Sequence, residues 1–172
     1  MNFVPPVHLQ GLVFAAHPTT RGFGWILFER PLKPVAWGTV HADPKHDGDL
    51  IVRFEELLDK YEPAVVVLEA FEGPGTQRAE RIRALCRLMV REIEERAIEN
   101  PIFDRAVIRA AFAEFGVSTR PDIAQVIAKS VVDISHLLPP KRNLGDSENI
   151  RQSLFDAAAL ALTYFVYRGD TK

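Results

Sequence analysis

The sequence contains a single cysteine, Cys86, which excludes a disulfide within the chain and a cysteine-rich metal site. Long apolar runs are also missing, and none approaches the ~18 residues that a membrane-spanning helix needs. The chain does not open with a basic segment followed by an apolar core, so we expect no signal peptide. These absences favour a cytoplasmic protein that does not associate with a membrane.

An excess of positive charge is missing as well, since 21 Lys and Arg residues face 23 Asp and Glu residues. Domains that bind nucleic-acid backbones are usually basic, so DNA binding would require the basic side chains to gather on one face. There is no internal repeat and no long linker. With 172 residues, of which 47% are hydrophobic, we predict one domain over residues 1–172, with residues 1–10 as an N-terminal extension.

A short apolar run rich in valine occupies residues 64–70, between Pro63 and the breakers Gly73-Pro74-Gly75. Such a run predicts a strand buried on both faces of a sheet, with a helical segment as the alternative. Glu69 falls at the carboxyl end of this strand, the edge at which open α/β sheets bind ligands. The other interpretation of Glu69 is a strand-end side chain turned to water.

The remaining pattern predicts an α/β fold in which a three-strand antiparallel meander continues into parallel strands, with helices on both faces of the sheet. The expected strands are 11–16, 23–28, 35–40 and, with a helical alternative because of its alanines, 105–112. The expected helices are 50–61, 76–99, 119–138 and 149–167.

Asp156 is a second carboxylate in an otherwise apolar setting, near the start of the last predicted helix. Aspartate is rarely buried without a partner. If that helix crosses the sheet, Asp156 approaches Glu69, and the two would repel unless a cation lay between them. Mg²⁺ prefers such oxygen ligands. A two-metal site that cleaves phosphodiesters normally uses three or four carboxylates, however, so these two alone are too few.

Four segments, in order and spacing, resemble the RuvC family of Holliday-junction resolvases, over roughly residues 11–167. The segments are 22–24, 62–69, 117–138 and 156–164. The resemblance implies a ribonuclease H-like fold and a dimeric, Mg²⁺-dependent endonuclease of branched DNA. It assigns Glu69 and Asp156 as catalytic residues and metal ligands.

Two positions depart from the family pattern. The aspartate that ends the family's first strand falls here at Ala16 or His17, and a further acid falls at Ser153. Only two of the four implied ligands remain, so we expect the two-metal chemistry to be weakened or absent. His17 is either a structural turn residue, which we favour, or a ligand of a metal softer than Mg²⁺. An acid from elsewhere, such as Glu72, is the candidate to complete the site.

The resemblance also implies DNA contacts from basic side chains around the site, for which ordinary solvated surface is the alternative. The candidates are Arg21, Arg78, Arg81, Lys141 and Arg142. The helix 76–99 is the candidate surface for a homodimer, which would suit a two-fold junction.

Three functions follow from these observations. The first is a RuvC-like protein of DNA recombination or repair that binds branched or double-stranded DNA with weak or no cleavage. The second is an active Mg²⁺-dependent, structure-specific endonuclease. The third is an α/β binding or assembly protein whose carboxylates are structural and which does not bind nucleic acid.

Overall fold

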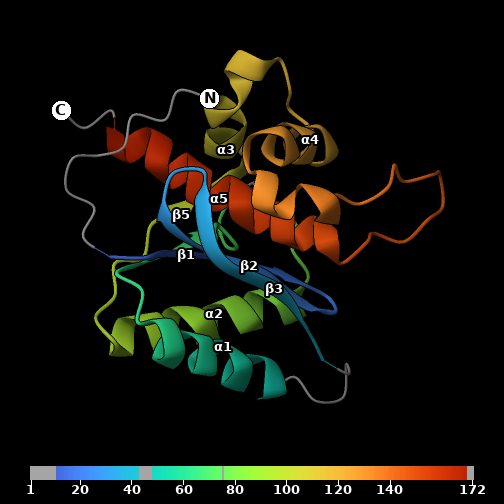
Figure 1. Ribbon diagram of the computed structural model, residues 1–172. Coiled ribbons are helices and arrows are strands. Elements are labelled where there is room, and N and C mark those ends of the chain that lie inside the picture. Colours follow the sequence, from blue (N-terminus) through green and yellow to red (C-terminus); the bar gives the residue numbers. More distant parts are fainter. Residues whose placement is uncertain (1–10, 43–47, 75, 170–172) are drawn as a thin grey trace.

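The structure, a computed structural model, describes residues 11–42, 48–74 and 76–169, so the predicted extension 1–10 lies outside the described residues. Five strands form one sheet in the order β3-β2-β1-β4-β5 (Figure 1). Their bounds are β1 Val13–Thr19, β2 Gly22–Arg30, β3 Lys33–His41, β4 Val65–Glu69 and β5 Ile102–Phe103. The first three strands pair antiparallel, and β4 pairs parallel with both β1 and β5. The predicted meander and central strand are therefore confirmed.

Helices cover both faces of the sheet (Figure 1). One face carries α1 Gly48–Tyr61 and α2 Glu80–Glu95, and the other carries α3 Arg105–Ala111, α4 Arg120–Ser130 and α5 Arg151–Gly169. Two 3₁₀ helices, η1 Ala113–Phe115 and η2 Val132–Leu137, follow α3 and α4. Within the described part of the chain, no helix combines the length and apolarity needed to cross a bilayer. The predicted α/β class with helices on both faces is confirmed.

Four predicted elements differ in type or extent. Residues 105–111 form α3, the helical alternative and not the expected strand, because the Asp104 side chain accepts a hydrogen bond from the Val107 amide (3.0 Å) and caps a helix there. The predicted helix 76–99 shortens to Glu80–Glu95, and the helix 119–138 stops at Ser130 and continues as η2. The first strand continues to Thr19, so His17 lies in a strand and not in a turn.

Side chains alternate between the two faces along β1 and β4, as strand geometry requires. On β1, Phe14 and Ala16 pack into the cluster under α1 and α2, whereas Val13 and Ala15 pack against α5. The valines of β4 alternate in the same way. Continuing this alternation places His17 and Glu69 on the face that α5 covers.

Helix α5 lies directly on the sheet, and every residue from Gln152 to Phe165 is buried. Gly24, the β2 partner of His17, permits this contact. A Cβ atom at Gly24 would lie 2.3 Å from the Leu154 nitrogen and 2.5 Å from the Ser153 carbonyl oxygen. The missing side chain thus lets the first turns of α5 rest on β2, which brings Asp156 next to His17.

Candidate functional site

Glu69 and Asp156 meet on opposite sides of the His17 imidazole. The Nε2 atom of His17 lies 2.8 Å from a Glu69 carboxylate oxygen, and its Nδ1 atom lies 3.7 Å from an oxygen of Asp156. Arg78 Nη2 also lies 3.1 Å from the same Nε2 atom, so this nitrogen stands between a carboxylate and a guanidinium. The distance to Asp156 is too long for a hydrogen bond, and Nδ1 has no hydrogen-bond partner among the described residues. His17 therefore occupies the space between the two acids.

Glu69 is further surrounded by two arginines. Arg78 Nη2 lies 3.9 Å and Arg105 Nη1 lies 3.8 Å from its carboxylate oxygens. Burial acts to raise the pKa of Glu69, but the hydrogen bond from His17 and the positive charges of His17, Arg105 and Arg78 outweigh it and lower this pKa to about 2. Side chains of the protein itself thus stabilise the ionised form of Glu69.

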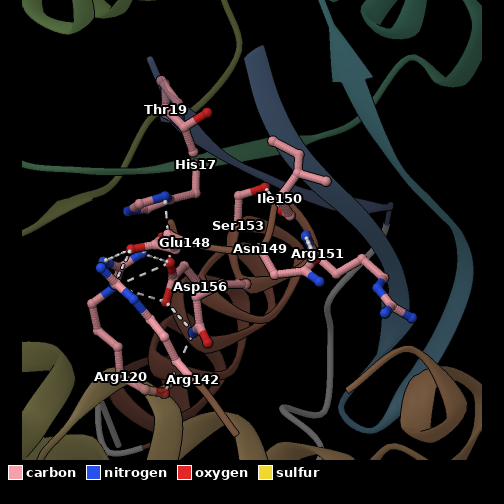
Figure 2. A network of polar contacts seen from close by, with 12 residues as sticks. His17, Thr19, Arg120, Arg142, Glu148, Asn149, Ile150, Arg151, Ser153 and Asp156 are labelled. Atoms are coloured by element: carbon pink, nitrogen blue, oxygen red, sulfur yellow. Dashed lines mark hydrogen bonds and ion pairs between the residues drawn. The ribbon is translucent and has the colours of Figure 1, made fainter. Parts of the chain in front are cut away.

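Asp156 is 4% exposed and is held by Arg120, which begins α4 (Figure 2). Arg120 Nε lies 3.1 and 3.2 Å from the two carboxylate oxygens, and its Nη2 also donates to Asp156. The same guanidinium reaches Glu148 at 2.7 and 3.1 Å. Burial acts to lower the pKa of Arg120, but Asp156 and Glu148 raise it above its ordinary value. The amide of Gln152 donates to Asp156 at 3.1 Å.

This donor set does not fit a pair of Mg²⁺ ions. Both acids already bind guanidinium or imidazole groups, which would have to leave before oxygen atoms could face a metal. Ser153 donates its hydroxyl to the Ile150 carbonyl (2.5 Å), and Glu72 pairs instead with Arg87 (2.6 Å). No group of three or more His, Cys, Asp or Glu residues suited to a metal ion occurs in the residues that the structure describes. Glu72 therefore does not complete the site.

Two hollows flank the bridge between Arg120 and Glu148, and both carry basic side chains. The smaller, of about 380 Å³, is lined by His17, Arg21 and Arg78. The larger, of about 1010 Å³, has five basic and three acidic residues on its walls. The basic residues are Arg105, Arg109, Arg120, Lys141 and Arg142, and the acidic ones are Asp122, Asp146 and Glu148. Positive charge is thus gathered around the acids, although the chain as a whole carries a net charge of −2.

Four of the five basic residues predicted to contact DNA line these hollows, namely Arg21, Arg78, Lys141 and Arg142. Arg81 lines neither of them. The sequence reasoning missed Arg105, Arg120 and Glu148. Arg105 fell in the segment wrongly expected to be a strand. The Arg120–Asp156 contact joins residues 36 positions apart, and no local pattern marks it.

No protein-family model matches the sequence, and a search of the curated proteins gave no match. Among solved structures, RuvC of Thermus thermophilus superposes with a TM-score of 0.67 at 16% identity, covering 93% of this chain and 97% of that one. RuvC of T. thermophilus in complex with a Holliday junction substrate gives 0.62 at 19% identity, covering 94% and 98%.

The yeast mitochondrial Holliday junction resolvase Ydc2 gives a TM-score of 0.62 at 12% identity, covering 95% of this chain and 81% of that one. All three similarities span nearly the whole chain. The chain therefore has the ribonuclease H-like fold of the RuvC-type resolvases.

Proposed function

We propose that this protein is a RuvC-like DNA-binding protein of recombination or repair, which binds branched DNA without cleaving it. The proposal rests on one observation: positively charged side chains of the same chain already pair with both Glu69 and Asp156. Three carboxylates, Glu69, Glu148 and Asp156, are matched by three guanidinium groups, Arg78, Arg105 and Arg120. A metal-dependent nuclease would instead leave its carboxylates free for divalent ions.

Partly exposed arginines beside the acids support binding of a phosphate group. The Arg78 side chain is 16% exposed and lines the smaller hollow, and the Arg105 side chain is 23% exposed and lines the larger one. Guanidinium groups form charge-assisted hydrogen bonds with phosphate oxygens. We therefore expect DNA phosphates to be held by arginines here, with no metal cofactor.

The kind of DNA is suggested by the structural neighbours, which are Holliday junction resolvases, one of them bound to a junction. We expect a homodimer through α2, where Leu88 is 40% exposed, because a two-fold dimer suits a branched two-fold substrate. Analytical ultracentrifugation of the purified protein tests that expectation. A cytoplasmic location would keep Cys86 as a free, buried thiol.

Binding and cleavage of a labelled four-way junction, measured beside a linear duplex of equal length, test the proposal. We expect preferential binding to the junction in EDTA, in Mg²⁺ and in Mn²⁺, with no cleaved product in any of them. Glu69→Gln serves as the control for a carboxylate-dependent reaction.

Two results would contradict the proposal. Junction cleavage that disappears in Glu69→Gln would identify an active Mg²⁺-dependent endonuclease, the second candidate, which the names of the structural neighbours favour. Failure to bind either DNA would instead favour an α/β binding or assembly protein that does not act on nucleic acid.

A further inference from the structure

The segment between η2 and α5 projects from the body of the protein (Figure 1), and Leu144 lies near its middle. Residues 140–147 are all exposed, and Leu144 is 107% exposed. The ends of this segment, on both sides of the turn, line the larger basic hollow. Leu144 therefore stands at the rim of the surface to which the proposed function assigns DNA.

The leucine is carried by an ordered turn. Asp146 N–H donates to the Asn143 carbonyl (3.1 Å), and Asn143 N–H donates to the Asp146 carboxylate (3.0 Å). Arg142 Nε donates to the Asp146 carbonyl (2.6 Å). Gly145 follows Leu144 with a φ of +89°, as the third position of a type II turn requires. Every one of these bonds is made without the Leu144 side chain.

Two further features adapt this turn to DNA. Pro139 and Pro140 restrict the backbone where the segment leaves η2, which limits the motion of the turn. Lys141 and Arg142 come directly before it and line the hollow beneath, where they would meet phosphates. A turn that holds one exposed leucine next to phosphate-binding groups has the chemistry of an apolar wedge, which proteins insert between base steps.

We propose that Leu144 enters the branch point of the bound DNA and unstacks a base pair there, an inference that rests on the proposed function. Paired bases at a junction are already weakened, so a wedge costs less there than in an unbroken duplex. Leu144 would therefore supply preference for branched over linear DNA, while the surrounding basic side chains supply binding to both.

Fluorescence of 2-aminopurine placed at the branch point of a four-way junction reports unstacking directly. The wild-type protein is expected to raise the fluorescence on binding. Leu144→Ala is expected to lose that rise and to lower the preference for junction over duplex about tenfold, with duplex affinity unchanged. Leu144→Phe is expected to keep both properties. Val52→Ala on α1, which also truncates an exposed apolar side chain, is the matched control.

The outcomes separate the wedge from the function on which it rests. A full fluorescence rise with Leu144→Ala would overturn the wedge and leave junction binding intact. An equal loss of affinity for junction and duplex, with unchanged circular dichroism, would also overturn it, because the residue would then act in general binding. If the wild-type protein binds neither DNA, the proposed function itself fails.

Discussion

Asp156 is a single side chain that balances much of the charge of Arg120. Because the carboxylate is buried, Asp156→Asn would leave the guanidinium short of a counter-charge. Breaking a fully buried pair costs about 3 kcal/mol or more, but Arg120 is 33% exposed and keeps Glu148, so we expect a loss of about 1–2 kcal/mol of unfolding free energy. Urea denaturation measures the loss. Glu56→Gln, which removes the exposed pair with Arg53, should change stability by less than about 0.5 kcal/mol. Equal effects of the two substitutions would contradict the pairing described here.

Glu69 gives a pH dependence with a definite sign. Its pKa is 4.5 ordinarily and about 2 in the folded protein, so its ionised form stabilises the fold above pH 4.5. This contribution, about 3 kcal/mol, is lost as the pH falls from 4.5 toward 2. We expect wild type to exceed Glu69→Gln in unfolding free energy at pH 6 and the difference to close near pH 2. A difference that stays constant over this range would show that the Glu69 charge is not stabilised by folding.

Among the elements, the contact between α5 and β2 controls the site geometry. Gly24→Ala would place a Cβ atom within 2.5 Å of the Ser153 and Leu154 backbone, which cannot move without shifting the helix. We expect a loss of about 2–3 kcal/mol in urea denaturation. Gly48→Ala, at the start of α1, is the control and should be near neutral, because a Cβ atom there meets no described atom within 4 Å. A Gly24→Ala protein as stable as wild type would show that the helix does not depend on this contact.

The elements also show what the sequence could predict. Valine-rich and alternating apolar runs identified the meander, β4 and α5, because burial on a sheet leaves a strong local pattern. The segment 105–111 escaped prediction because its alanines suit both structures and the Asp104 cap decides between them. Glu69 and Asp156 stood out as acids in apolar surroundings. Their partners Arg105 and Arg120 did not, because those pairs depend on how distant segments pack.

For the molecule as a whole, we expect the affinity for DNA to fall steeply as the salt concentration rises, because each contact with a DNA phosphate releases counterions. Lys141→Ala is expected to weaken binding to junction and duplex alike and to reduce the slope of log Kd against log salt by about one. Lys60→Ala on α1, which covers the other face of the sheet, should leave the slope unchanged. If both lysine variants changed the slope equally, the hollows beside Arg120 would not be the DNA-binding surface.

The position of Arg120 decides what balances the negative charge of Asp156. A guanidinium group is part of the chain and is always present, so this charge is balanced at any concentration of free divalent ions. For the same reason, two substitutions would not be enough to turn this site into a metal site. Acids in place of His17 and Ser153 would lie close to Arg120, a cation that cannot diffuse away and that would compete with a metal ion for them. Converting this centre into one that holds ions would require exchanging Arg120 at the same time.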